Sequence, residues 1–260
     1  RQPARQMLGW RCWPLMAGCM ALVAVTLGVP LGMIAYWLTQ HGVQAISPAE
    51  VSAPLLVDAM LSSLRLGLAG AALTVALALP LGFLAVRYRG RLITVIERSA
   101  YLAQGVPGIV VALALISLTV RHAYPLYQTA PLLIIAYAIV FLPLALVCVR
   151  AALEQAQPRL EDTARSLGLG WAAVAWRVLL PLSGPGLGAA AALVFASVVT
   201  ELTATLLLAP IGTQTLATQV WADTSTLAFA AAAPYAALMI ALSFLSTWLL
   251  ARQFAGVRSL

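Results

Sequence analysis

One acidic side chain stands inside the apolar run of residues 186–208. Glu201 lies among Ala, Leu, Val and Thr residues, and Thr205 follows it four positions later. Because a carboxylate is costly to bury in hydrocarbon, acidic residues inside membrane spans commonly mark a route for ions or solutes. A carboxylate near the end of a span can equally cap a helix or pair two helices. Glu201 and Thr205 are therefore candidate residues of a pathway or gate, with the capping role as the alternative.

None of the familiar catalytic motifs is present in the sequence. There is no H-E-x-x-H, no G-x-S-x-G and no pair of Asp residues within an apolar run, as an intramembrane enzyme would need. The chain also lacks G-x-x-x-x-G-K-[ST], so it cannot hydrolyse ATP through a P-loop. We expect no enzyme, no catalytic residue and no cofactor. A channel or a membrane scaffold protein is the alternative class, although no repeated polar filter or ring of charges is present.

Long apolar runs must position Glu201 and Thr205. The chain is 62% hydrophobic and only 9% charged, which is too few charges to cover a soluble globule of 260 residues. We therefore expect an all-α polytopic membrane protein with about six spans, each near the roughly 20 residues that cross a bilayer. The expected spans are residues 14–38, 66–86, 101–120, 131–149, 186–208 and 228–251. Gly105, Pro107 and Gly108 interrupt the third, which indicates a helix inside a bundle.

The distribution of arginine predicts the orientation of the chain. All fifteen basic residues are Arg, and all except Arg65 and Arg121 fall before the first span, in the loops after the second and fourth spans, or at the end of the sixth. Positive charge is retained on the cytoplasmic side, so both termini are expected in the cytoplasm of a bacterial inner membrane. This also explains the net charge of +7 without nucleic acid. Residues 1–13 would form a cytoplasmic lead-in, 14–252 the six-span domain and 253–260 a cytoplasmic tail.

The longest stretch that is neither a span nor a plain loop is residues 160–185. Apolar residues recur at helical intervals before and after a pair of glycines, which indicates two short amphipathic helices joined by a sharp bend. Two prolines are expected to end the second helix before the next span begins. Such a helical pair could seat an apolar face in a groove of a partner protein. The residues concerned are Leu160, Ala164, Leu167, Trp171, Ala175, Val178 and Leu182, with Gly168, Gly170, Pro181 and Pro185.

This stretch resembles the EAA motif, E-A-A-x3-G-x9-I-x-L-P, of the permeases of ABC importers. The spacing agrees from end to end, with Asp162 in place of Glu, Thr163 in place of Ala and Val178 in place of Ile. The resemblance implies the type I importer permease fold, in which residues 151–185 would form a coupling loop seated in a cytoplasmic ATPase subunit. The ATPase-coupling residues that it implies are Asp162, Ala164, Gly168, Leu180 and Pro181. An amphipathic helix lying on the lipid surface is the alternative.

A second segment is similar to one family of these permeases. Residues 200–208 and 211–218 are similar to the E-L-P-A-T-L-L-L and G-x-x-T-L-A-T segments of ferric iron permeases, although Thr203 stands where Pro is usual. The resemblance implies ferric iron as the solute, a periplasmic solute-binding protein that delivers it, and a second permease unit. It further implies that this chain is the second half of a fused permease, which its start without Met fits. Importers of thiamine, aminoethylphosphonate, polyamine or sulfate share much of the pattern and remain alternatives.

The possible metal ligands are scattered along the chain. Imidazole and phenolate groups suit ferric iron, but His41, His122, Tyr124 and Tyr127 are spaced like interfacial aromatic residues. The three cysteines have no spacing typical of a metal site, and we expect them to be reduced near the cytoplasmic ends of spans. We therefore expect no resident metal.

Overall fold

The computed structural model describes residues 10, 12–40, 53–88, 90–156 and 158–257, and this part of the chain is helical without a strand. This confirms the expected all-α class. The elements are α1 (Cys12–Thr39), α2 (Ala53–Arg87), α3 (Arg91–Leu102), η2 (Ala103–Gly105), α4 (Gly108–His122), η3 (Tyr124–Leu126), α5 (Ala130–Gln155), α6 (Pro158–Ser166), α7 (Trp171–Val174), η4 (Ala175–Leu179), α8 (Leu180–Val199), α9 (Thr203–Leu208), α10 (Leu216–Ser225) and α11 (Phe229–Val257).

Five helices in the described part are long and apolar enough to cross a membrane. They are α1, α2, α5, α11 and the helix Trp171–Val199, which runs through α7, η4 and α8. The expected third span is different, because α3 with η2 and α4 meet at an angle of 106°. Pro107 is the cause, since a residue before proline avoids helical angles and Val106 is extended at φ −93° and ψ 119°. The bent pair counts as a sixth span only if both arms are taken together.

The core of the bundle is formed by α2, α5 and α8. Four glycines let these helices approach closely, because a Cβ at each would meet a side chain of the neighbouring helix. The tightest approach is at Gly186, where a Cβ would lie 2.3 Å from the Cβ of Ala152. These three helices therefore form one packed unit. The other close positions are Gly67 against Phe195, Gly70 against Tyr137 and Gly82 against Val149.

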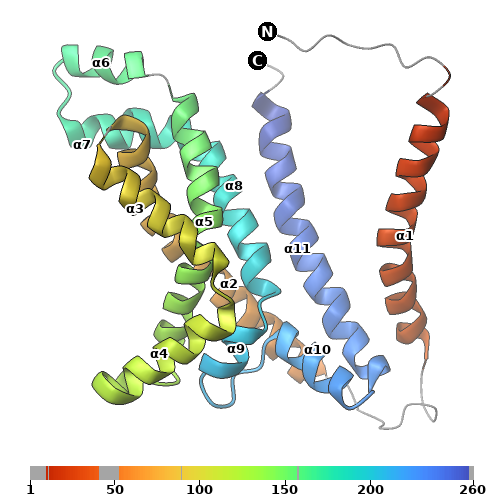
Figure 1. Cartoon of the computed structure of the whole chain (residues 1–260). Coiled ribbons are helices and arrows are strands. Elements are labelled where there is room, and N and C mark those ends of the chain that lie inside the picture. Colours follow the sequence, from red (N-terminus) through yellow and green to blue (C-terminus); the bar gives the residue numbers. More distant parts are fainter. Residues whose placement is uncertain (1–9, 11, 41–52, 89, 157, 258–260) are drawn as a thin grey trace.

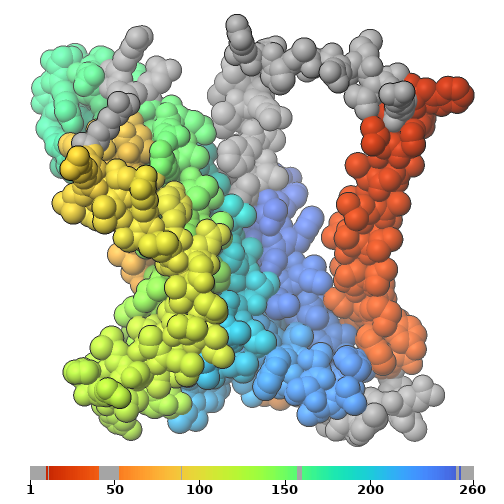
Figure 2. Space-filling model, viewed as in Figure 1, coloured from red at the N-terminus to blue at the C-terminus, as the bar shows by residue number. Residues whose placement is uncertain are grey.

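The peripheral helix α1 adds nothing to this core. None of the residues of α1, all of which the structure describes, is buried. Figure 2 shows open space between α1 and α11 along much of α1, and the two helices meet where Trp37 lies 5.5 Å from Phe229 between ring centroids. The apolar surface of α1 is thus free for lipid or for another chain.

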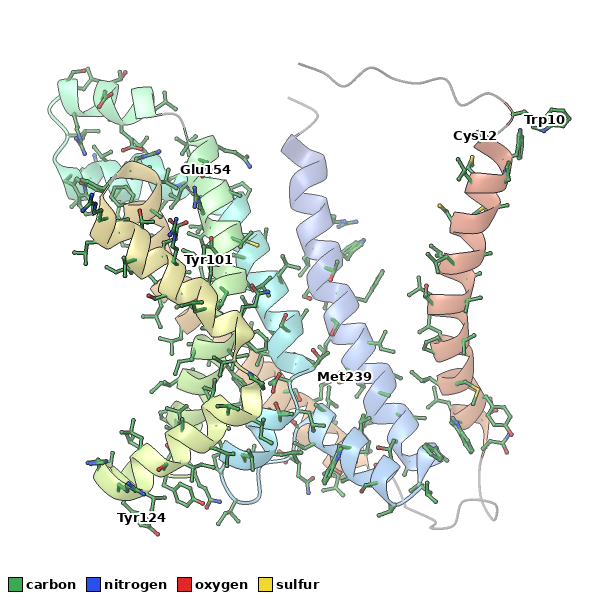
Figure 3. The ribbon with its side chains drawn as sticks, in the orientation of Figure 1. Trp10, Cys12, Tyr101, Tyr124, Glu154 and Met239 are labelled. Atoms are coloured by element: carbon green, nitrogen blue, oxygen red, sulfur yellow. The ribbon has the colours of Figure 1, made fainter. Side chains whose placement is uncertain are left out.

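The short helices mark two ends of the molecule. In Figure 1, α6 and α7 lie at the same end as the start of α1 and the end of α11, whereas α4, α9 and α10 lie toward the opposite end. Figure 3 places the side chain of Glu154 at the first end and that of Tyr124 at the second. The two sets of candidate residues therefore lie at opposite ends of α8.

Candidate functional site

The bend between α6 and α7 is a glycine-dependent helix end. The N–H of Leu169 donates to the carbonyl of Ala164 at 3.1 Å, and the N–H of Gly168 donates to that of Arg165 at 2.9 Å. This pair of bonds is the Schellman motif, which requires a left-handed residue after the helix. Gly168 has a φ of +86°, and a Cβ there would meet nothing within 4 Å. The glycine is therefore needed for its backbone angle and not for space.

The apolar residues of this segment divide between two surfaces. Ala164 is 6% exposed and packs inward, so it does not share one exposed stripe with Leu160, Leu167 and Trp171, although the helical spacing had suggested one. Leu167 is 78% exposed and Trp176 is 74% exposed, and Trp171 and Leu160 also have large exposed fractions. Asp162 shares the exposed surface. The segment thus exposes large apolar side chains and one carboxylate at this end of the molecule.

The expectation that Pro181 and Pro185 end the second helix is wrong. The helix continues from Trp171 to Val199. A π-turn at Ala175–Leu179 absorbs the irregularity, because the N–H of Leu180 donates to the carbonyl of Ala175. Pro181 follows directly after this π-turn, so the regular ladder of α-helical hydrogen bonds is already interrupted where its N–H is missing. The part of the bend segment (residues 160–185) that follows Gly170 is consequently continuous with a membrane span.

An ion pair joins α6 to the end of α2, and the sequence did not predict it. Arg87, the last residue of α2, donates from Nε to Oε1 of Glu161 at 2.8 Å and from Nη2 to the same oxygen at 2.5 Å. Nη2 also donates to the carbonyl of Ala156 at 2.9 Å. The only sequence signal was a basic residue at the end of a span, which the positive-inside rule explains equally well.

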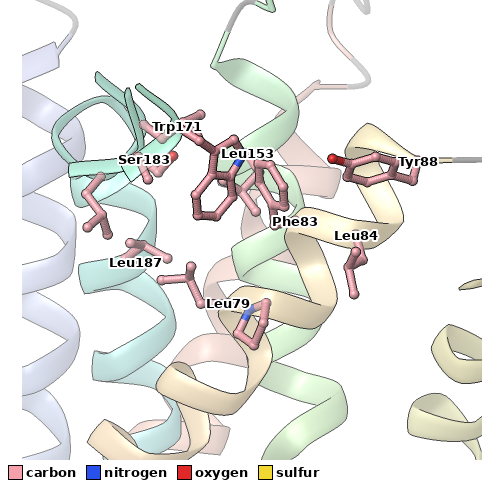
Figure 4. Close-up of a pocket in the computed structure, with 12 residues that line it drawn as sticks. Leu79, Phe83, Leu84, Tyr88, Leu153, Trp171, Ser183 and Leu187 are labelled. Atoms are coloured by element: carbon pink, nitrogen blue, oxygen red, sulfur yellow. The ribbon is translucent and has the colours of Figure 1, made fainter. Parts of the chain in front are cut away.

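An apolar cavity of about 400 Å³ lies beneath the bend segment, between α2, α5 and α8. Figure 4 shows Phe83 of α2 facing Trp171 of α7, and their ring centroids are 5.8 Å apart in an edge-to-face arrangement. Leu180 also lines the cavity, and the buried hydroxyl of Ser183 has no partner among the described residues. Aromatic contact thus supplements the ion pair between α2 and the bend segment.

Glu201 does not lie inside a helix, contrary to the expectation of one span over residues 186–208. The chain leaves helical form between Val199 and Thr203. The side chain of Glu201 supplies a partner for one main-chain N–H at the start of α9. The hydroxyl of Thr200 donates to the carbonyl of Ala196 at 3.1 Å, and Oε1 of Glu201 accepts from the N–H of Ala204 at 3.1 Å. The carboxylate therefore caps α9, as the alternative reading of this residue allowed.

Thr205 continues a chain of hydrogen bonds from this break into the core. Its hydroxyl donates to the main-chain carbonyl of Glu201 at 2.7 Å and lies 2.7 Å from the hydroxyl of Tyr137. A threonine hydroxyl has one hydrogen, so Tyr137 must be the donor to Thr205. Tyr137 is 1% exposed and Thr205 is 1% exposed. These hydrogen bonds hold the break between α8 and α9 against α5.

The two interruptions in the described spans meet at Glu201. A Cβ on Gly108, the first residue of α4, would lie 2.9 Å from Oγ1 of Thr203 and 3.2 Å from Oε1 of Glu201. Thr203 itself donates to Oε1 of Glu201 at 2.6 Å. The narrow crevice beside Glu201 includes Ser63 and Thr215 and is too small for a water-sized sphere. A closed constriction, lined by hydroxyls, the carboxylate of Glu201 and the apolar side chains of Leu66, Val198 and Val199, thus stands where two broken helices meet.

The described residues contain no group of three His, Cys, Asp or Glu side chains that could hold a metal ion. The rings of Tyr124 and Tyr127 stack on each other with centroids 6.1 Å apart, as interfacial aromatic residues do. Cys12 and Cys19 are exposed and free, and Cys148 is free and partly buried. His41 lies outside the described residues.

Comparison with known proteins places this geometry in a family. The family model described as "Binding-protein-dependent transport system inner membrane component" matches residues 75–259. The chain belongs to that family. This permease is 40% identical over 230 residues to "Fe(3+)-transport system permease protein FbpB 2" of Haemophilus influenzae, a match that covers 88% of the chain and 45% of the relative. The chain thus spans less than half the length of that relative.

A solved structure shows the fold of this permease. The chain superposes on one described as "Inward facing conformations of the MetNI methionine ABC transporter" with a TM-score of 0.61 and 18% sequence identity, covering 78% of this chain and 99% of the other. The permease therefore has the type I ABC importer fold. It is a multi-pass subunit of the inner membrane and not itself an enzyme, in agreement with the sequence analysis.

Proposed function

We propose that this permease unit carries ferric iron into the cell, driven by ATP hydrolysis on a partner subunit. The supporting observation is the 40% identity to a permease described as an Fe(3+)-transport protein over 88% of the chain. A periplasmic solute-binding protein would deliver the iron, and a second permease unit, fused or separate, would complete the pathway. Thiamine, aminoethylphosphonate, polyamine and sulfate are the alternative solutes.

The bend segment is the proposed docking site for the ATPase. Its exposed leucines and tryptophans supply an apolar face, and Asp162 adds a charge at its edge. The helix is rigid, because α7, η4 and α8 run on as one span. Movement of the docked segment would therefore move α8 directly. Under this assignment the start of α1 and the end of α11, which lie at the same end as α6, would face the cytoplasm.

The constriction at Glu201 is the proposed gate. Hard, highly charged cations prefer oxygen ligands. Carboxylate, hydroxyl and main-chain carbonyl oxygens lie at this point, beside the apolar Leu66, Val198 and Val199. The crevice is closed, and the two helix breaks beside it can re-orient without unwinding a whole span. Glu201 would attract the cation when the breaks move apart.

Uptake by vesicles that hold the complete transporter tests the solute. With ATP inside and loaded binding protein outside, labelled ferric iron is expected to accumulate well above the level in vesicles without the permease. Labelled thiamine, polyamine, aminoethylphosphonate and sulfate serve as the comparison, each with its own binding protein. Iron accumulation no higher than in the empty vesicles would reject ferric iron, while ATP-dependent accumulation of one comparison solute would identify the replacement.

A further inference from the structure

We propose that Arg87 is a positioning residue that makes α2 move together with α6. The proposal rests on the proposed docking of an ATPase on the bend segment. It assigns to Arg87 and Glu161 a role in passing that movement into the spans, in addition to the continuous helix through α7 and α8.

The contacts of Arg87 reach three elements at once. Its guanidinium binds Oε1 of Glu161 on α6 through two nitrogens. The same group donates to the carbonyls of Leu153 at 3.4 Å and Ala156 at 2.9 Å, which lie at the end of α5. Arg87 is itself the last residue of α2. One side chain therefore ties the ends of α2 and α5 to α6.

Burial distinguishes this ion pair from the pair of Arg150 with Glu154. The side chains of Arg87 and Glu161 are 13% and 9% exposed, whereas those of Arg150 and Glu154 are 40% and 52% exposed. Leaving one charge of a buried pair without its partner is strongly unfavourable, while exposed pairs contribute little. The Arg87–Glu161 pair is therefore expected to stay closed when α6 moves, so that α2 moves with it. The Arg150–Glu154 pair is suited as a control.

Helix α6 has few other connections to α2. It packs mainly against α7 and η4, so its movement reaches α8 through the chain itself. Glu161 and Asp162 are neighbours on α6, yet the first is buried against Arg87 and the second is exposed. The helix thus offers one carboxylate to α2 and the next to the outside. Without Arg87, α8 would still follow α6 through the chain. Helix α2 would lose its direct link to α6 and would follow only through its packing on α8 and the contact of Phe83 with Trp171.

This difference between α2 and α8 can be measured with spin labels. In a chain whose three cysteines are replaced by serine, one label is placed at Leu77 on α2 or, in a second sample, at Leu193 on α8; both positions are exposed. ATP is added to the complete transporter and the change in the spectrum of each label is recorded. In the parent protein both labels are expected to respond. In Glu161→Ala, which removes the oxygen that accepts from Arg87, the response at Leu77 is expected to fall well below that at Leu193. Part of the response at Leu77 remains, because α2 also packs on α8.

Two further variants complete the test. Glu154→Ala removes one exposed ion pair and is expected to leave both responses unchanged. Glu161→Gln keeps an oxygen that can accept from Arg87 and is expected to recover most of the response at Leu77 that Glu161→Ala loses, which loss of folding could not explain. Equal responses at both labels in Glu161→Ala, or no recovery in Glu161→Gln, would overturn the role of Arg87. Absence of any response in the parent protein would instead contradict the proposed docking of the ATPase.

Discussion

Replacing Gly168 with valine is expected to reduce ATP-driven uptake about tenfold while the permease stays folded in the membrane. The reason is the φ of +86° at this residue. A side chain in the left-handed region costs about 1–2 kcal/mol, and about 1.4 kcal/mol corresponds to a tenfold change in an equilibrium. The Schellman end of α6 would therefore be populated less, and the docking face would lose its orientation. Uptake and the amount of folded permease are measured in the same vesicles.

Gly170 supplies a matched control two residues away. It has extended angles, φ −67° and ψ 163°, which valine adopts readily, and a Cβ there also meets nothing within 4 Å. Gly170→Val is therefore expected to keep most of the uptake. Equal losses in the two variants would mean that added bulk on the docking face, and not the turn at Gly168, causes the defect.

Replacing Glu201 with glutamine is expected to lower ferric iron uptake at least tenfold and to leave ATP hydrolysis intact. Glutamine keeps the oxygen that accepts from the N–H of Ala204, so the cap of α9 is preserved and only the charge is lost. At an effective dielectric constant of about 20, one pair of charges about 4 Å apart interacts by about 4 kcal/mol. This exceeds the roughly 1.4 kcal/mol of a tenfold effect. Initial rates of uptake and hydrolysis are compared with those of the parent protein.

Glu201→Ala separates the two roles of this residue. Alanine removes both the charge and the cap, so its effect includes any loss of structure at the break. If glutamine transports normally and alanine does not, Glu201 serves only to cap α9, and the gate must be sought elsewhere. If both variants lose uptake while hydrolysis continues, the charge itself is required.

The sequence allowed most of the spans to be predicted, because hydrocarbon imposes one simple requirement on chain length and polarity. The helices α1, α2, α5 and α11 lie where the apolar runs placed them. The same requirement could not locate the breaks. The run 186–208 is apolar on both sides of Glu201, yet α8 ends at Val199 and α9 begins at Thr203, where Glu201 accepts from the N–H of Ala204.

The prolines were poor guides to where the helices end. Pro107 accompanies a turn of 106°, whereas Pro181 and Pro185 stand within a continuous helix. The difference lies in the partners available to the freed carbonyls. A π-turn re-pairs the backbone before Pro181, but the extended Val106 before Pro107 ends η2. Such accommodation depends on residues on both sides of each proline and on the helices that pack against it.

The candidate residues were predicted only as far as local spacing reaches. Gly168 was correctly expected at a sharp bend, since the bend needs a residue without Cβ. The partnership of Arg87 with Glu161 joins positions that are 74 residues apart. Nothing in the spacing of either residue distinguishes that pair from ordinary cytoplasmic charges. Long-range contacts of this kind follow from the packing of α2 on α5, which the apolar pattern does not specify.

Cross-linking tests most directly whether the bend segment docks the ATPase. A photoreactive amino acid is placed at Asp162, which is exposed on α6, or at Ile211, which is 89% exposed beyond α9 at the opposite end. Illumination of the complete transporter is expected to join position 162 to the ATPase subunit and to leave position 211 without that product. A cross-link to the ATPase from position 211, with none from position 162, would contradict the assignment.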